Sequence, residues 1–579
     1  MLWEIEDFKG IISAQVEIGP GKATILTGIN SSGKSSTIQS LLLAAQSLYN
    51  DGSVVLNGPL VRLGGAEDLV REGSASGDIR IRLGIRTERP GSALRGASLT
   101  AEYEFVAAED RASLRARRLQ IFGKTANDVP LNLATENSRA ADRELVMQAT
   151  NQMGPRTVLH LKSLLNDERK QLKTYVVMQG LRPAAVVQLL NPKRTEVVYA
   201  RTFRSMAEAL LNTSAPNFSR GGLTPFILRE FLELVDQASE SNEDLKPIAH
   251  AFERLRPGNP YSFAPLWDSL SIQQRDRAVT AAATQRALKE YALVPVRNSP
   301  SRYGAPGMGL LESALEMALG DSYAGLNALS GALDELASRV QYLGPLRDEP
   351  RVVWNHWNEL TRGLPVGTRG EFSAAVLSRA GGRHIHYVPP EEAPAVAPLA
   401  VAVDQWLAYL EIGEKVKARG RGKLGVGFDL HFHGKVRDLT SVGVGVSQAL
   451  PLLVGLLSAP RESLFIVEQP ELHLHPAVQA RLADFLLTAR PDVSLIIETH
   501  SEAFITRIRR RAAEGKLATS NVDISFIEVE EGGSRSRRLQ LSEFGDLDEW
   551  PDGFLSSSEA DVRAILQMNI RRARGVVDA

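Results

Sequence analysis

The chain contains no cysteine among its 579 residues. This absence excludes a disulfide framework, thiolate-ligated zinc, iron–sulfur clusters and catalytic thiols. The opening residues 1–10 carry acidic side chains among apolar ones and lack the basic-then-apolar order of a signal peptide. We therefore expect a protein that works in the reducing cytoplasm.

Long hydrophobic runs are missing as well. The most apolar stretch, residues 449–457, is about half as long as a membrane-spanning helix, so it predicts a buried helix and no membrane contact. An excess of one charge is also missing, since 67 basic and 68 acidic residues give a formal net charge of -1. No overall electric field therefore attracts this chain to nucleic acid.

Two short basic runs remain as candidates for a local contact with DNA. They are residues 415–423 (KVKARGRGK) and residues 507–511 (RIRRR). Basic runs of this length more often lie on solvated loops or helix faces than on nucleic acid. Both interpretations stay open here for each run.

The hydrophobic pattern divides the chain into three parts. Residues 1–125 contain short alternating runs, which predict antiparallel strands beside a buried strand. Residues 126–335 change to helical segments without sustained heptads. In residues 336–579 apolar runs alternate with helices, which favours a parallel sheet. We predict an α/β fold, with a mixed sheet and a flanking antiparallel sheet, that is split by a mostly helical insertion.

A phosphate-binding loop is the strongest signal in the sequence. Residues 28–35 read G-I-N-S-S-G-K-S, which completes the pattern G-x4-G-K-[ST] between a predicted strand and a predicted helix. The backbone N–H groups of such a loop bind the phosphates, its lysine reaches the β- and γ-phosphate oxygens, and its last hydroxyl ligates Mg²⁺. An ordinary glycine turn is the less favoured alternative. The residues expected to bind ATP are Gly28, Asn30, Ser31, Ser32, Gly33, Lys34, Ser35 and Ser36.

Two apolar strands with polar ends are predicted in the last part of the chain. Residues 464–468 predict a buried strand that ends in Glu468, at the edge of the sheet where α/β folds bind ligands. There Glu468 would hold Mg²⁺ together with Ser35. Residues 494–500 predict a second buried strand, and its His500 can contact the γ-phosphate or an attacking water. A purely structural His500 is the alternative.

A glycine-rich turn at residues 441–448 stands before the apolar helix, and the order of these motifs resembles a known family. P-loop, glycine-rich turn, helix, acidic strand and strand with histidine resemble the prokaryotic ABC-type ATPases of the SMC/RecF/OLD kind, often called AAA family. EQPELHLHP at 468–476 and Trp-Pro-Asp-Gly-Phe at 550–554 resemble one branch of it. The resemblance covers residues 1–50 and 340–555 and leaves the helical middle unmatched.

The resemblance implies a dimer that is held together by ATP. The glycine-rich turn of one protomer would cap the γ-phosphate bound by the P-loop of the other, so two molecules of ATP with Mg²⁺ would lie in the interface. The residues implied for this turn are Gly443, Gly445, Ser447 and Gln448. The Ser-Gly-Gly of the wider family is absent, so either Ser447 or the backbone would contact the phosphate.

A glutamine stands where most ABC-type ATPases carry their catalytic glutamate. Gln469 can orient a water molecule but cannot accept its proton. Either hydrolysis is slow, or Glu471 supplies the carboxylate. The catalytic candidates are therefore Glu468, Gln469, Glu471 and His500, and we expect long-lived ATP-bound dimers.

Three further residues keep two interpretations each. His473 and His475 suggest a metal site, although the resemblance favours a D-loop. Arg347 faces either phosphate or the dimer partner, or it forms an ion pair with Asp348 or Glu349.

The resemblance implies a nucleotide-switched dimer that acts on double-stranded DNA or on a partner effector, in DNA maintenance or in defence against phages and mobile elements. A slow or non-hydrolysing regulatory subunit for a separate effector protein is the alternative, which Gln469 favours. The acidic residues after Leu495 form no convincing nuclease cluster, so we expect no Toprim nuclease. The large insertion disfavours a transporter subunit, and the missing lid and phosphoacceptor motifs disfavour a kinase.

Overall fold

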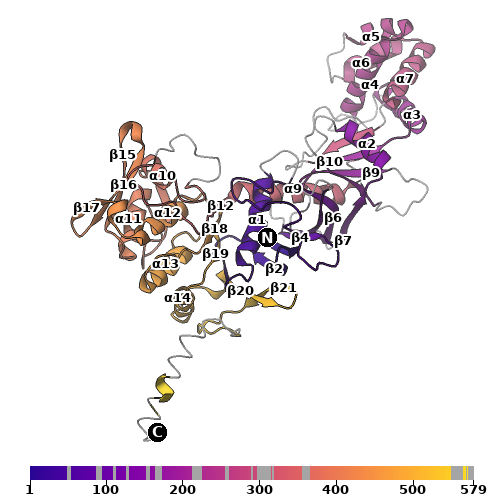
Figure 1. The fold of residues 1–579 in the computed structure, drawn as a ribbon. Helices are drawn as coiled ribbons and strands as arrows, with labels where there is room; N and C mark the ends of the chain where they lie inside the picture. Colours follow the sequence, from indigo (N-terminus) through magenta and orange to yellow (C-terminus); the bar gives the residue numbers. More distant parts are fainter. Residues whose placement is uncertain are drawn as a thin grey trace.

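A sheet of 16 strands runs through the computed structural model (Figure 1). The structure describes residues 1–48, 54–86, 94, 96–108, 113–124, 130–150, 157–162, 173–211, 224–253, 260–288, 291–296, 315, 319–354, 366–549, 565–568 and 570. The strand order is β11-β10-β9-β8-β7-β6-β5-β4-β1-β2-β21-β20-β3-β19-β18-β12. The Trp-Pro-Asp-Gly-Phe element lies outside the described residues.

Five neighbouring strands of this sheet are parallel and carry the site. They are β20 (Val522–Glu530), β3 (Ala23–Gly28), β19 (Ser494–Glu498), β18 (Leu464–Glu468) and β12 (Val340–Leu343). The first and last parts of the chain therefore meet between β3 and its neighbours β19 and β20. This confirms the prediction of a core built from both ends of the sequence.

Helices cover both faces of the parallel strands, and the side chains alternate between the two cores. Ile466 packs on the side of α1 (Lys34–Leu48) and α9 (Asp321–Arg339). Phe465 and Val467 pack on the opposite side. The helices there are α11 (Leu399–Tyr409), α12 (Val444–Ser458), α13 (Pro476–Thr488) and α14 (Glu502–Ala513). Burial on both faces explains why these strands are almost continuously apolar.

The other half of the sheet is mainly antiparallel. Its strands are β1 (Leu2–Phe8), β2 (Ile11–Glu17), β4 (Ile79–Arg86), β5 (Ser98–Ala107), β6 (Leu114–Lys124), β7 (Pro130–Asn137), β8 (Thr157–Leu161), β9 (Thr174–Gln179), β10 (Arg182–Leu189), β11 (Tyr291–Pro295) and β21 (Gly533–Leu539). In β4 buried and part-buried residues alternate, as expected when one face of a sheet packs on the core.

The expected start of a helical region at residue 126 was wrong. The strands β7 to β11 continue the antiparallel sheet through residues 130–189 and 291–295, with the short helix α2 (Ala140–Ala149) among them. Apolar runs such as TYVVMQ at 174–179 are too short for periodicity to separate a strand from a helix. The helical part of the insertion is therefore smaller than the sequence suggested.

A helical module with its own core occupies residues 192–287. It contains α3 (Pro192–Leu211), α4 (Thr224–Ser239), α5 (Lys246–Glu253), α6 (Pro260–Ser269) and α7 (Ile272–Ala287). Its core gathers six aromatic side chains, which are Tyr199, Phe203, Phe231, Phe252, Phe263 and Trp267. Figure 1 shows the module at one end of the long sheet, beyond β9 and β10.

A lobe at the opposite end of the sheet carries two small sheets (Figure 1). One pairs β13 (His384–Tyr387) with β14 (Ala395–Pro398). The other joins β15 (Lys415–Gly420), β16 (Val426–Phe432) and β17 (Lys435–Asp438), and packs on α10 (Ser373–Ala380) and α11. Among the helices that the structure describes, none has the length and apolarity to cross a membrane.

We predict that Phe231→Ala loosens the helical module and leaves nucleotide binding unchanged. The ring of Phe231 lies 5.1 Å from that of Phe203 and 5.7 Å from that of Trp267. Loss of such a buried ring costs about 3–5 kcal/mol, and the module shares no core with the parallel strands. Hydrogen exchange should rise across residues 192–287. The matched control is Val197→Ala, whose side chain is 69% exposed, and equal exchange in both variants would contradict a separate core.

Candidate functional site

The P-loop turns from β3 into α1 through two glycines that no other residue replaces easily. Gly28 has φ +143°, and a Cβ atom there would lie 2.3 Å from the carbonyl oxygen of Ile527. Gly33 has φ +99°, and its Cβ would lie 3.2 Å from the side chain of Ile11. The loop is thus pressed against β20 and β2, and its shape depends on glycine.

Lys34 is buried at the start of α1 and folds back onto the loop. Its Nζ donates hydrogen bonds to the carbonyl oxygens of Gly28 at 3.1 Å and Ile29 at 2.6 Å. Burial lowers the pKa of Lys34, and the nearby Glu498 opposes this effect. Of the other loop residues, Asn30 and Ser31 are exposed. The remaining loop positions of the prediction, Ser32 and Ser36, are buried and half-buried.

Two carboxyl groups end adjacent strands beside the P-loop helix. Glu468 ends β18, and the parallel register pairs it with Glu498 at the end of β19. The hydroxyl of Ser35 donates to both carboxylate oxygens of Glu498, at 3.0 and 2.9 Å. The structure therefore brings together Ser35, Glu468 and Glu498.

Glu498 was missed in the sequence analysis, which followed this strand only to His500. The signal was present, because an acid ends the apolar run SLIIE just as Glu468 ends LFIVE. What the sequence did not reveal is that β19 lies between β3 and β18. That order places Glu498 between the P-loop strand and the strand of Glu468.

Burial disfavours the charged forms of these two acids. Burial, followed by the charge of Glu468, raises the pKa of Glu498 to about 7. Burial also raises the pKa of Glu468. The hydroxyl of Tyr342 donates to Glu468 Oε1 at 2.6 Å and fixes that carboxyl group. A nearby positive charge would favour the charged form of both acids and lower their pKa values.

The donor atoms of this group fit Mg²⁺. A hydroxyl and two carboxyl groups are the hard oxygen ligands that Mg²⁺ prefers. Octahedral ligands at about 2.0–2.1 Å from the ion lie about 2.9 Å from one another, and Ser35 Oγ lies 2.9 Å from Glu498 Oε2. In the described part of the chain, no group of three or more His, Asp or Glu side chains could hold a metal. The prediction of a metal site at His473 and His475 therefore has no support there.

The turn after β18 contains a residue with a positive φ angle, and Arg347 forms a hydrogen bond to the turn from its buried side. Gln469 has φ +44°, its N–H donates to the carbonyl oxygen of Glu498 at 2.8 Å, and its carbonyl accepts from Arg347 Nη1 at 2.9 Å. Arg347 is buried, and burial lowers its pKa to about 10. Its Nε and Nη2 atoms have no hydrogen-bond partner in the described structure.

The structure does not support the ion pairs expected of Arg347. No ion pair joins it to Asp348 or Glu349 among the described residues. Asp348 instead accepts a hydrogen bond from Trp354 Nε1 at 2.8 Å and lies 3.6 Å from Arg351. Arg347 thus supports the turn at Gln469 from inside the protein.

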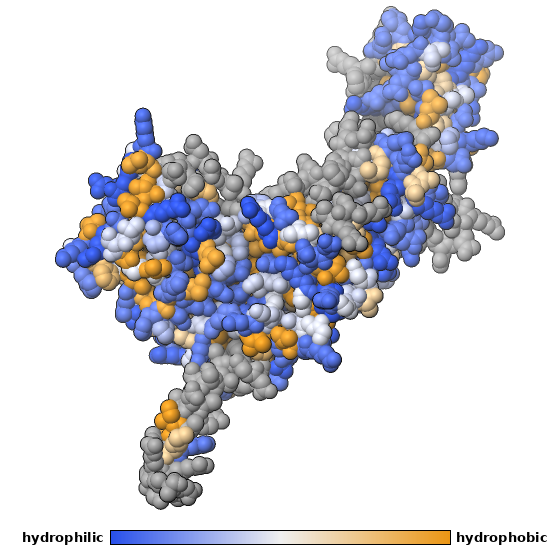
Figure 2. Space-filling view, in the orientation of Figure 1, coloured by the Kyte–Doolittle hydropathy of each residue, from blue (hydrophilic) through white to orange (hydrophobic). Residues whose placement is uncertain are grey.

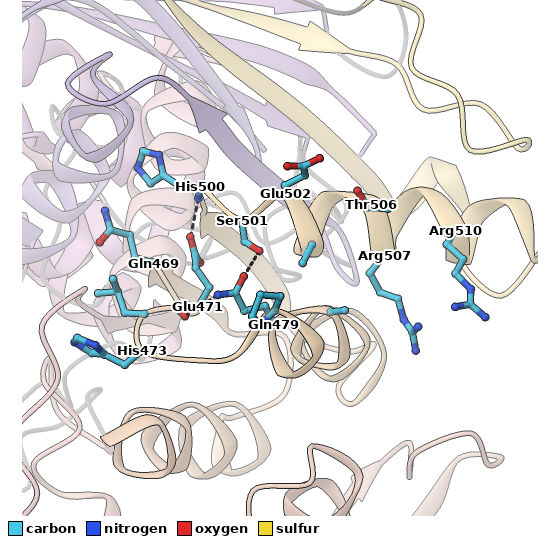
Figure 3. A pocket seen from close by; sticks show the side chains of 14 residues that line it. Gln469, Glu471, His473, Gln479, His500, Ser501, Glu502, Thr506, Arg507 and Arg510 are labelled. Carbon is cyan, nitrogen blue, oxygen red and sulfur yellow. Dashed lines mark hydrogen bonds between the residues drawn. The ribbon is translucent and has the colours of Figure 1, made fainter. Parts of the chain in front are cut away.

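Glu471 connects this turn to the loop of His500 (Figure 3). Its Oε1 accepts the backbone N–H of His500 at 2.7 Å, whereas its buried Oε2 has no partner in the described structure. Burial raises the pKa of Glu471. Burial and then the charge of Lys34 lower the pKa of His500, which favours its neutral form.

A cavity of about 870 Å³ opens beside these residues. Its lining includes Gln469, Glu471, His473 and His500 from the site, and Arg507 and Arg510 from α14 (Figure 3). It gives the Gln469–Glu471 turn and His500 access to solvent.

The glycine-rich turn at the start of α12 lies apart from the P-loop of its own chain. Gly443 is the N-cap of α12 and provides no side-chain cap. The hydroxyl of Ser447 is buried and donates to the carbonyl oxygen of Val444 at 2.7 Å, and Gln448 is buried as well. The hydroxyl of Ser447 is therefore occupied within its own helix.

The histidine loop packs against this turn. A Cβ atom on Gly445 would lie 2.8 Å from the carbonyl oxygen of His473, so only glycine permits this approach. His473 itself has φ +61°. His475 is the N-cap of α13, and its ring accepts the N–H of Ala477. These contacts give His475 a structural role.

We predict that Gly28→Ala weakens nucleotide binding. The added methyl group would meet a backbone oxygen of β20 that cannot move away, and φ +143° is strained for alanine. We expect an affinity at least about tenfold lower, which is a free-energy change of about 1.4 kcal/mol, by titration with a fluorescent ATP analogue. Gly420→Ala is the control, because a Cβ there meets nothing within 4 Å. Unchanged binding by Gly28→Ala would show that the loop does not hold the nucleotide.

A family model matches part of the site. Residues 345–506 match the family described as "AAA domain, putative AbiEii toxin, Type IV TA system". The match includes the α12 turn, Glu468 and His500, and it covers less than a third of the chain. The P-loop lies outside the matched residues. Strand β3, which precedes the P-loop, pairs with β19 of the matched segment.

Solved SMC head domains are similar at low identity. The Smc head domain of Pyrococcus furiosus, with an extended coiled coil and bound to the C-terminal domain of ScpA, is 12% identical; the match covers 93% of this chain and 96% of that chain, with a TM-score of 0.29. The SMC head domain from Thermotoga maritima is 9% identical. The match covers 93% of this chain and 97% of that chain, with a TM-score of 0.31. No curated protein matches the chain.

Because these TM-scores are low, the fold rests on the sheet order of the chain itself. Residues 345–506 are similar to an AAA domain, and the P-loop strand β3 lies beside the matched strand β19 in the same sheet.

Proposed function

We propose that the chain binds ATP with Mg²⁺, hydrolyses it slowly, and uses it to hold two copies of the chain together. The observation that carries this proposal is the contact of Ser35 with Glu498 beside Glu468. It joins the P-loop to two strand-end acids in one oxygen-rich site. Such a site suits a nucleoside triphosphate with its Mg²⁺ ion.

The P-loop residues bind the triphosphate in this proposal. The N–H groups of residues 28–36 surround the phosphates at the start of α1, and Lys34 exchanges its carbonyl partners for phosphate oxygens. Ser35, Glu468 and Glu498 would hold Mg²⁺, which neutralises phosphate charge when it is bound. Tyr342 keeps Glu468 in place.

In this proposal, Gln469, Glu471 and His500 together replace the catalytic glutamate that most ABC-type ATPases carry at position 469. Gln469 orients a water molecule through its amide, and its turn is fixed by Arg347 and Glu498. Glu471 accepts the proton, because its Oε2 has no other partner and burial keeps its pKa above that of an ordinary carboxyl group. His500 donates a hydrogen bond as a neutral imidazole. Hydrolysis is slow because Glu471 lies two residues beyond the usual position.

The dimer follows from the position of the α12 turn. Among the described residues, no hydrogen bond links residues 443–448 to residues 28–36 of the same chain, which agrees with a turn that serves the other copy. The P-loop of a second copy supplies the phosphate in this proposal. Each ATP then lies between the two chains, as the family resemblance implies.

The biological role is a switch that acts on double-stranded DNA or on a partner effector, in DNA maintenance or in defence against phages and mobile elements. The matched family carries a putative toxin in its description, and one similar head domain was solved with a bound ScpA domain. Both findings agree with a partner protein. A regulatory subunit with negligible hydrolysis is the second candidate, and Gln469 favours it. We place the protein in the cytoplasm.

We predict that the pure protein turns ATP over slowly and that Lys34→Ala lowers the rate by about 10²-fold or more, because it removes a charge that stabilises the phosphates. Gln469→Glu should raise the rate by adding a carboxylate beside Glu468. Phosphate release, with and without duplex DNA, and light-scattering mass with ATP check both. Dimers that form with ATP while only Gln469→Glu hydrolyses would support the regulatory subunit, and a monomer in every state would refute the dimer.

We further predict that Glu498→Gln weakens Mg²⁺-dependent ATP binding by about 10- to 100-fold, the usual effect of losing a group that supports a metal site. Binding of ATP without Mg²⁺ should change little. Calorimetric titration with and without Mg²⁺ separates the two. Glu462→Gln is the control, since Glu462 is exposed and precedes β18, the strand next to β19. Equal Mg²⁺ dependence in wild type and Glu498→Gln would remove Glu498 from the site.

A further inference from the structure

One of the two basic runs lies on an exposed small sheet, which we call the basic sheet and define as residues 415–438. It has seven basic and two acidic side chains in a chain of net charge -1. The basic residues are Lys415, Lys417, Arg419, Arg421, Lys423, Lys435 and Arg437, and all are exposed. Figure 1 shows its strands at the outer edge of the lobe, and Figure 2 shows hydrophilic and hydrophobic residues side by side there.

Both acids of the basic sheet are already engaged. Asp429 lies 3.0 Å from Arg421 and 3.6 Å from Arg419. Asp438 accepts the N–H groups of Thr440 and Ser441, which start the next turn of chain. Asp429 therefore neutralises part of the charge of Arg419 and Arg421, and the lysines of the basic sheet are left without an ion pair inside it.

Five cations of the basic sheet have no carboxylate within 4 Å in the described chain. They are Lys415, Lys417, Lys423, Lys435 and Arg437. Asp404 accepts the N–H of Val416. It also interacts electrostatically with Lys415 and Lys417 at longer range. Glu414 accepts the N–H of His433. On the outer face, Lys415, Lys417 and Arg419 outnumber Asp429 and Asp438, whereas Lys435 and Arg437 pair with Phe432 and Leu430 and belong to the opposite face.

The second basic run, residues 507–511, forms ion pairs and a hydrogen bond within the chain. This favours a structural role for it over contact with DNA. Arg507 and Arg511 each lie 2.6 Å from Asp484. Arg510 lies 2.6 Å from Glu514, and Arg509 donates to the carbonyl oxygen of Gly545. This run stabilises α14 and leaves little charge for a ligand.

The geometry of the basic sheet suits a polyanion with a regular backbone. Val416 points inward and is buried against α10 and α11, so Lys415, Lys417 and Arg419 share the outer face. Alternate residues of a strand are about 6.6–6.8 Å apart, which makes a straight row of cations. A Cβ on Gly420 or Gly422 would meet nothing within 4 Å, so a bulky ligand can approach the backbone.

The same face lacks the aromatic side chains that stack on single-stranded bases. The residues paired with the outer row are His431, Val436, Asp429, Asp438 and Gly427. Contact through lysine and arginine alone reads phosphate and not sequence. Duplex DNA satisfies this pattern better than single-stranded DNA.

We propose that the basic sheet binds the phosphate backbone of duplex DNA without sequence preference. Strand β17 leads through Leu439–Ser441 directly to Gly443 and α12, so DNA on this sheet lies one short turn from the residues that face the second nucleotide. The proposal rests on the DNA-acting form of the proposed function and names its surface. ATP is not required for the binding itself.

The test compares two charge reversals of equal size. Lys415→Glu with Lys417→Glu alters the basic sheet, whereas Lys193→Glu with Arg201→Glu alters two exposed cations of the helical module. Fluorescence anisotropy with a labelled duplex of mixed sequence, without nucleotide and over a range of salt concentrations, gives affinities and salt slopes. Thermal unfolding followed by circular dichroism confirms that both variants are folded.

We expect the basic-sheet variant to bind about tenfold or more weakly and to lose about two units from the slope of log affinity against log salt, about one per phosphate contact. The helical-module variant should bind like wild type. Absence of DNA binding by wild type, or equal loss in both variants, overturns the proposal. Binding of polyglutamate but not DNA also overturns it, in favour of an acidic protein.

A parallel ATP titration of the same preparations keeps the two proposals apart. DNA binding that depends on the basic sheet, in a protein that fails to bind ATP, would support this surface and refute the proposed function. ATP binding without DNA binding would do the reverse.

Discussion

The parallel pairing of β3, β19 and β18 is the constraint on which the site depends. It aligns Leu26, Glu498 and Glu468 across three strands, and the P-loop follows β3 directly. Ser35 can then hydrogen bond to Glu498, a residue 463 positions away. Each strand is buried on both faces, so a shift in register would carry apolar side chains out of both cores. The packing of the sheet thus fixes the chemistry at its edge.

The site concentrates buried charge that the backbone keeps in place. Lys34 and Arg347 donate to carbonyl oxygens, and Glu471 accepts a backbone N–H. A buried charge without such partners is costly, and Gln469 and His473 adopt positive φ angles in the same loop. Strained backbone and incompletely paired polar atoms are common where a ligand completes the structure.

The two ends of the sheet differ in construction. The helical module has an aromatic core and a buried Arg286, which bonds to Tyr199 within the module. The lobe at the other end contains α12 and the basic sheet, so its charged surface is connected by a few residues to the α12 turn, which we propose contacts ATP. A ligand on the lobe is therefore better placed to influence ATP than a ligand on the helical module.

The sequence by itself determined the P-loop, the strand ending in Glu468 and the helix after the glycine-rich turn, because each signal lies within a few neighbouring residues and follows from local backbone and burial rules. Only the tertiary structure decided that Glu498 faces Ser35, that Arg347 supports Gln469, that strands β7 to β10 continue the sheet, and which basic run keeps lysines without a carboxylate of the described chain within 4 Å. These depend on strand order and on partners far along the chain, and local periodicity contains no information about either.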